Sequence, residues 1–211
     1  MSRPFQAPAS DAERRHAALV QEVSRRVREA LDGAHAVDAD HAALTVERAP
    51  RPAAPERLAR AHPGGAGARQ QARGLYERCL VHYREVLRAS QADGAVDDVG
   101  AALAAFVAAN LRAVQGVDLG PPAMQALERQ LAGVLRGSPG WVATAARERQ
   151  MYFEQLAILA VLVSESFTQA VLMGPAALAN VQRAARGYLQ QLLGLQPHQL
   201  VVGEHGLALA G

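Results

Sequence analysis

Apolar residues recur at three- and four-residue steps through most of the chain from Ala68 onward. This spacing puts them on one face of an α-helix. Residues typical of helix starts and stops divide the stretch, because Asp and Pro favour first turns and Gly ends helices. For example, Asp97 is the expected cap of the second helix. The expected helices span about 68–89, 97–116, 121–137, 144–173 and 175–194.

The longest expected helix starts at either Ser138-Pro139 or Thr144, and its middle is apolar on every side. That pattern is typical of the central helix of a bundle. After the last helix, residues 200–202 and 207–209 are mostly apolar and flank a turn that contains glycine, which predicts a small β-hairpin. Because two short strands are marginal alone, this hairpin must pack on the bundle.

A separate amphipathic helix is predicted near the N-terminus. Ser10 and Glu13 have the spacing of a capping box, and Gly33 follows the last apolar position. Arginines occupy the opposite face of this helix. Its apolar stripe consists of Val20, Val23, Val27, Ala30 and Leu31.

The stretch between this helix and residue 68 is rich in proline and glycine and has no helical period, so it reads as a flexible linker with a short helical turn around 55–61. Three regions follow: a helix at 1–33, a linker at 34–67 and a helical domain at 68–211. The predicted fold class is all-α, a five-helix bundle with a small C-terminal β-hairpin, preceded by an isolated N-terminal helix.

Composition agrees with this fold, because alanine and leucine are strong helix formers and aromatic residues make up only 4% of the chain. All 22 basic residues are arginine, but 20 acidic residues are interleaved with them and the net charge is +2. We therefore expect no nucleic-acid binding. Residues 1–30 have no apolar core of a secretory signal, and the longest apolar run, 156–163, is too short to span a bilayer. A cytoplasmic protein without a membrane span is expected.

Signatures of catalysis and metal binding were sought in the sequence. The seven histidines lack ligand spacing, Cys79 stands alone, and neither a G-x-S-x-G nor a phosphate-binding loop is present. The sequence therefore predicts no catalytic residue, no metal and no cofactor.

Two carboxylates of the longest helix lie on the same side of it. Glu154 and Glu165 are almost three whole turns apart, about 16 Å along the axis. A cooperating pair of catalytic carboxylates needs a separation of roughly 5 to 9.5 Å. We therefore expect ion pairs instead, with Arg183, Arg186 or Arg112 as partners.

One amide is predicted to face the core. Asn110 is in register with Phe106 and the other apolar positions of its helix. A buried amide without partners costs about 1–3 kcal/mol. Asn110 is therefore expected to hydrogen-bond a backbone carbonyl, Tyr76 or Tyr152, or the hairpin.

Four segments together resemble a known family. They are 96–110 (VDDVGAALAAFVAAN), 150–157 (QMYFEQLA), 185–189 (ARGYL) and the closing Gly206-Leu207. They look like recurring stretches of an uncharacterised family of proteobacterial proteins, over roughly 68–209. The resemblance implies a helical domain of unknown function and supplies no activity.

The leading functional hypothesis is a non-enzymatic protein-interaction module, such as an adaptor, a chaperone-like protein or a secretion-associated factor. Its candidate surface is the N-terminal stripe, with low aromatic content and arginines beside it. That stripe could pack on its own domain, self-associate, bind a foreign partner or contact a membrane. Packing on the chain itself or self-association is the preferred outcome. The partner-binding residues would be Val20, Val23, Val27 and Leu31.

The alternative hypothesis is a helical bundle that binds a small ligand or acts as an enzyme. It would use a polar site made of Asn110, Tyr152, Glu154 and Arg186.

Overall fold

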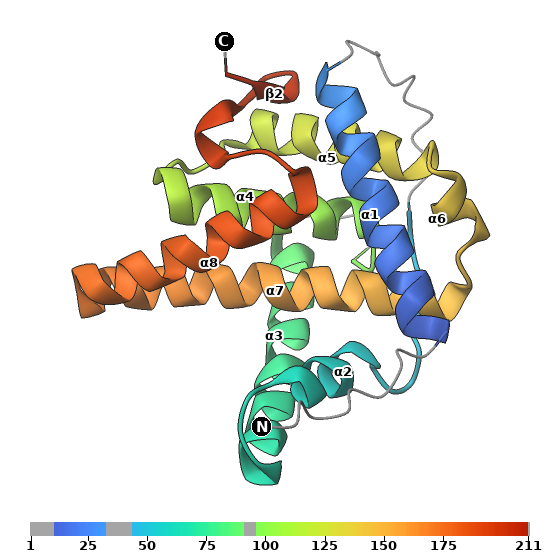
Figure 1. Ribbon diagram of the computed structural model, residues 1–211, viewed down its shortest axis with the longest axis vertical. Helices are drawn as coiled ribbons and strands as arrows, with labels where there is room; N and C mark the ends of the chain where they lie inside the picture. The colour runs from blue at the N-terminus through green and yellow to red at the C-terminus, as the bar shows by residue number, and fades with distance from the viewer. Residues whose placement is uncertain (1–10, 33–43, 91–95, 211) are drawn as a thin grey trace, which may run out of the picture.

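The protein was analysed as a computed structural model, which describes residues 11–32, 44–90 and 96–210 (Figure 1). The described part is mostly α-helical and ends in a two-stranded antiparallel hairpin. The predicted fold class is confirmed. Its helices are α1 (Asp11–Asp32), α2 (Ala54–Ala61), α3 (Ala66–Ser90), α4 (Val99–Gln115), α5 (Pro121–Arg136), α6 (Pro139–Ala143), α7 (Ala146–Met173) and α8 (Pro175–Leu193). A 3-10 turn, η1 (Pro197–Gln199), leads into β1 (Leu200–Gly203) and β2 (Gly206–Leu209).

The central element is α7, which packs against α2, α3, α4 and α8 (Figure 1). Its middle is buried on several sides, including Phe153, Ala157 and Ile158, which explains why the sequence is apolar all round there. Among the described helices, α7 alone is long and apolar enough to cross a membrane by length and composition. A helix at the core of a bundle passes the same test, so this is weak evidence for a membrane span.

The start of α4 differs by one residue from the prediction. Asp98, and not Asp97, is the N-cap, because its carboxylate accepts a hydrogen bond from the backbone N–H of Ala101 at 2.9 Å. The carboxylate of Asp97 instead accepts hydrogen bonds from Arg84 at 2.7 Å and Arg48 at 2.9 Å. Asp97 thus joins α3 and the segment before α2 to the start of α4.

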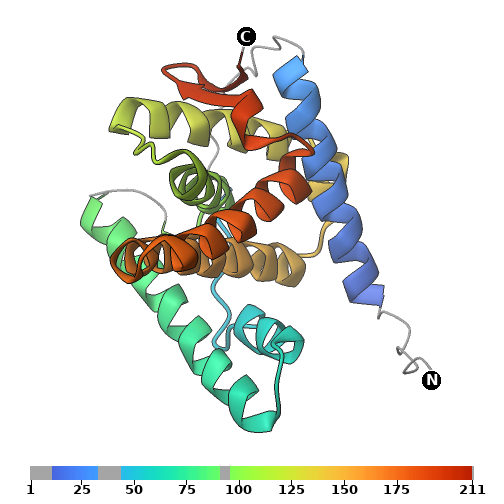
Figure 2. The ribbon, with the colours of Figure 1, turned by 60° about the vertical axis from the view of Figure 1, so that its left-hand side comes forward.

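The N-terminal helix α1 is not isolated. It lies along one side of the molecule, where it contacts α5, α6, α7 and α8 (Figure 2). Val23 and Val27 of its apolar stripe are fully buried in the main core. Burying each such side chain stabilises by about 1.5–3 kcal/mol, which accounts for the packing. Ser10 and Gly33 lie outside the described residues, so the predicted capping box of Ser10 with Glu13 and the predicted stop at Gly33 are not tested.

The predicted linker is packed structure from residue 44 onward. Thr45 forms an isolated antiparallel bridge with Asp98, and Val46 is buried. The expected helical turn at 55–61 is confirmed as α2, which packs beside α3 in both views (Figures 1 and 2). The prolines and glycines of this segment break the helical period, and we therefore predicted a linker. They do not prevent the segment from packing on the bundle.

The C-terminal hairpin is present where it was predicted, and it packs mainly on α5. Gln130 of α5 fixes it: its Nε2 donates to the carbonyl of Leu207 at 2.8 Å, and its Oε1 accepts from the N–H of Leu207 at 2.7 Å. Gly206 has a φ of 101°, and a Cβ there would lie 2.7 Å from Gln130 Oε1. Glycine is therefore required both by the turn and by the close approach.

Candidate functional site

The four polar residues of the alternative hypothesis do not form one site. Arg186 is exposed on α8, whereas Asn110 and Glu154 are fully buried. Tyr152 is buried too, with its ring 6.3 Å from that of Trp141, and burial raises the pKa of its hydroxyl.

The carboxylate of Glu154 lies at the N-terminus of α2. One oxygen accepts hydrogen bonds from the backbone N–H groups of Ala53, at 2.8 Å, and Ala54, at 2.9 Å. The other accepts from Gln150 Nε2 at 2.7 Å. A carboxylate is stabilised at this position because the first N–H groups of a helix have no helical partner and carry partial positive charge. The predicted ion pair of Glu154 with an arginine is therefore wrong.

The expected partner of Glu165 is also wrong. Its side chain is 62% exposed and its carboxylate lies 3.9 Å from His82 Nε2. Arg112 instead pairs with Asp118 at 2.6 Å, and Arg183 donates to Asn180 Oδ1 at 3.2 Å.

Asn110 hydrogen-bonds a backbone carbonyl, which was one of its expected partners. Its Nδ2 donates to the carbonyl of Phe106, one turn earlier in α4, at 2.7 Å. Its Oδ1 is buried and makes no hydrogen bond to a described residue. The amide is thus satisfied mainly within its own helix, and no second helix is positioned by it.

The proposed partner-binding stripe faces the chain's own bundle. Val23 and Val27 are buried, and Val20 and Leu31 are half-buried against the same core. Little of this stripe remains available to another molecule in this arrangement.

The candidate functional site is instead a groove formed by α3, α4, the start of α5, and α7, which we call the α3–α7 groove. It has a volume of about 520 Å³. Cavities of about 300–1,000 Å³ are typical of binding sites. Its walls are mostly apolar, and two valines at its edge are exposed: Val86 at 51% and Val117 at 49%. The other apolar lining residues include Leu87, Ala105, Ala108, Leu119, Met124 and Val161.

Two polar groups in this groove are poorly satisfied. Tyr83 is only 5% exposed, and its hydroxyl makes no hydrogen bond to any described residue. Burial, followed by the charges of Glu128 and Asp98, raises the pKa of this hydroxyl. Burial and the charge of Asp98 likewise raise the pKa of Glu128, which is half-buried and has no basic partner among the described residues.

The edge of the groove carries charges that are already paired. Arg112 and Asp118 form one pair, and His82 lies near Glu165. Glu128 is thus the acid of the groove with an unmet demand for a cation or a hydrogen-bond donor. Among the residues that the structure describes, no three potential metal ligands are grouped closely enough to hold a metal ion.

Sequence reasoning missed this groove. Tyr83 and Val86 stand at helical spacing in the expected helix 68–89, which places both on its inner face, and nothing in the sequence distinguishes Glu128 from the other acids. Tyr83 is indeed buried, but Val86 and also Leu75, at 41% exposure, are not covered. The signal for the groove is an apolar residue that the sequence places on an inner face but that no helix covers. Only the packing of the helices shows which residues are left uncovered.

Comparison with known proteins gives a family without an activity. The family of unknown function (DUF6683) matches residues 8–210. No curated protein and no solved structure matches the chain.

Proposed function

The chain belongs to the family of unknown function (DUF6683), and we propose from its geometry that it is a non-enzymatic protein-interaction module. The α3–α7 groove is the surface that binds the partner. The observation that carries this proposal is a mostly apolar groove whose edge exposes Val86 and Val117. In its interior, the Tyr83 hydroxyl makes no hydrogen bond to a described residue, and Glu128 has no basic partner among those residues.

The apolar part of the groove suits a helical segment of another protein. An amphipathic helix binds such a groove through apolar side chains spaced by three and four residues. Covering Val86 and Val117 would add to the affinity, since each buried CH₂ group contributes about 0.8 kcal/mol.

The polar part of the groove specifies the charge of the partner. Glu128 lies near Asp98, so the groove interior is acidic and favours a basic side chain. The Tyr83 hydroxyl can donate or accept a hydrogen bond. We therefore propose a partner helix with an apolar face and an arginine or lysine that reaches Glu128.

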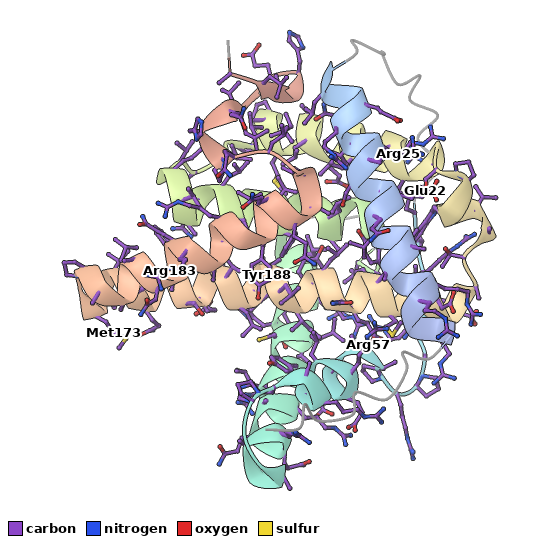
Figure 3. The ribbon with its side chains drawn as sticks, in the orientation of Figure 1. Glu22, Arg25, Arg57, Met173, Arg183 and Tyr188 are labelled. Carbon is purple, nitrogen blue, oxygen red and sulfur yellow. The ribbon has the colours of Figure 1, made fainter. Side chains whose placement is uncertain are left out.

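A second exposed apolar cluster supports an adaptor role. Val171, Leu172 and Met173, at the end of α7, are 55%, 78% and 76% exposed. Met173 lies at the tip where α7 meets α8, and this tip projects from the bundle (Figure 3). Exposed apolar clusters of this kind mark interaction surfaces. An adaptor needs two such surfaces, and the tip is our candidate for the second.

The groove is tested by changing its exposed valines. In the Val86→Asp/Val117→Asp variant, a buried charge would oppose apolar contact, and the amount of partner that copurifies should fall by about ten-fold or more. Val201→Asp is the matched control, because Val201 is 49% exposed and lies in the hairpin outside the groove. Equal partner recovery with both variants would contradict the proposal. Circular dichroism would show that both variants stay folded, as expected for exposed positions.

Glu128→Gln separates binding from folding. The raised pKa of Glu128 means that the folded chain holds this proton more tightly than the unfolded chain does. Ionisation of Glu128 therefore lowers the unfolding free energy as the pH rises above the pKa that this group has in the unfolded chain. The loss is complete once the pH exceeds its pKa in the folded chain. At neutral pH Glu128→Gln should raise the unfolding free energy, by about 0.5 kcal/mol after allowance for solvent screening. The same variant should bind a basic partner more weakly, whereas a merely structural Glu128 would leave binding unchanged.

A further inference from the structure

A second cleft lies between α1, α2, α7 and α8, and it shares no lining residue with the α3–α7 groove. Its volume is about 540 Å³. One wall is apolar and includes Phe106, Leu156 and Leu159. The ring of Phe106 is in edge-to-face contact with that of Tyr188, which also lines the cleft, at a centroid distance of 5.8 Å. The cleft is thus large enough for a small molecule with an apolar body.

Two arginines give this cleft a positive charge. Arg28 from α1 and Arg57 from α2 both line it, and none of the described acidic residues does. Among the described residues, neither guanidinium has an acidic partner: Arg28 donates to the carbonyl of Ser24 at 3.3 Å, and Arg57 donates to Met151 Sδ at 3.5 Å. Both contacts are weak for a group that can donate five hydrogen bonds.

The backbone of α8 makes room for Arg28. Gly194, which ends α8 with a φ of 69°, lies against the side chain, and a Cβ at this position would be 2.9 Å from Arg28 Cδ. Gln155 adds a further unsatisfied group, because its Oε1 is buried without a hydrogen bond to a described residue. The cleft therefore combines an apolar wall with two arginines that have no acidic partner among the described residues.

We propose that this cleft binds a small amphipathic anion, whose carboxylate or phosphate is held by one of these two arginines and whose apolar part lies against Phe106 and Leu156. Guanidinium groups bind carboxylate and phosphate through paired, charge-assisted hydrogen bonds. Arg57 is marked in Figure 3, below α7 and near the lower part of α1. Because α1 forms one side of the cleft, a ligand bound there would stabilise the packing of α1 on the bundle.

Isothermal titration of the full chain tests the proposal with four probes of equal chain length: decanoate, decyl phosphate, decanol and decyltrimethylammonium, each below its micelle concentration. We expect decanoate or decyl phosphate to bind about ten-fold or more tightly than decanol, and the cation to bind most weakly. The stronger of the two anions identifies the acidic group that the cleft prefers. Equal binding of decanol and both anions would overturn the proposal.

Substitutions locate the binding. One of the two variants Arg28→Gln and Arg57→Gln should weaken anion binding about ten-fold, since it removes a charge-assisted hydrogen bond, and this variant identifies the arginine that holds the anion. Arg183→Gln is the matched control, because Arg183 is an exposed arginine of α8 that does not line the cleft (Figure 3). Anion binding that falls equally in all three variants, or in none, would contradict a site at this cleft. Val86→Asp/Val117→Asp should leave anion binding unchanged, so failure of this site and failure of the α3–α7 groove are distinguishable.

Discussion

Glu154 connects the central helix to the segment before the bundle. Its carboxylate satisfies the N–H groups of Ala53 and Ala54, and these groups would otherwise be left without partners at the buried start of α2. The sequence showed an acid in the middle of an apolar helix, but it could not show which donors would reach it. Those donors come from about 100 residues away in the chain. Long-range partners of this kind are set by the packing of the helices.

The first prediction follows at this residue. Glu154→Leu leaves the two backbone donors without an acceptor, and an unsatisfied buried group costs about 1–3 kcal/mol, so the unfolding free energy should fall by about 2 kcal/mol or more. Glu154→Gln keeps an acceptor oxygen and should lose less. Both are measured by urea unfolding.

Glu165→Leu is the control on the same helix, because its carboxyl is largely exposed. The unfolding free energy of the Glu165→Leu variant should differ from that of the unaltered chain by about 0.5 kcal/mol at most. If the unfolding free energy of Glu154→Leu falls no more than that of Glu165→Leu, the contact of Glu154 with α2 contributes nothing to stability.

At the scale of elements, helix positions were largely predictable and helix contacts were not. The bounds of α5 and α8 follow from proline starts and glycine stops, and the hairpin was visible as two short apolar runs around glycine. Gly174 ends α7 as predicted, but α7 begins at Ala146, and Pro139 opens the separate short helix α6. The segment around α2 was predicted as a linker, because proline and glycine there suggested flexibility. Glycine and proline report on the local backbone, and they carry no information on whether a segment packs on a distant helix.

The contact of α1 with α6 gives the second prediction. Glu22 accepts hydrogen bonds from the Ser138 hydroxyl at 2.7 Å and the Gly140 N–H at 3.0 Å. These bonds lower the pKa of Glu22. Because the folded pKa is below the unfolded one, the stabilisation is present above the unfolded pKa and is lost as the pH falls through the folded pKa. The protection factors of the α1 amides, which compare the measured exchange rate with the intrinsic rate at the same pH, should therefore fall in acid.

Two substitutions isolate this contact. Glu22→Gln should speed exchange in α1 at neutral pH and remove part of its acid dependence. Gly140→Ala should act the same way, since a Cβ at this position would overlap the Glu22 carboxylate. Glu29→Gln is the control: Glu29 lies on α1 but pairs with Arg25 of the same helix. Exchange as fast in Glu29→Gln as in Glu22→Gln would mean that the contact with α6 does not fasten α1.

At the scale of the whole molecule, the described segments before residue 68 are part of the bundle. Val23 and Val46, from α1 and from the segment before α2, are buried in the main core. A chain cut to 68–211 exposes this core and leaves Glu154 without its backbone donors. It should lose the cooperative thermal transition that the full chain shows, as measured by calorimetry. A cooperative transition at an unchanged temperature would make the first 67 residues independent of the bundle after all.

Site-specific photo-crosslinking in the native cell tests whether the α3–α7 groove binds a protein partner. A photoreactive residue replaces Val86 at the edge of the groove or, as the control, Val201 in the hairpin, which is about equally exposed. The account predicts a discrete crosslinked product at position 86, absent at position 201 and reduced by Glu128→Gln. Products of the same size and yield at both positions, or none at position 86, would contradict it.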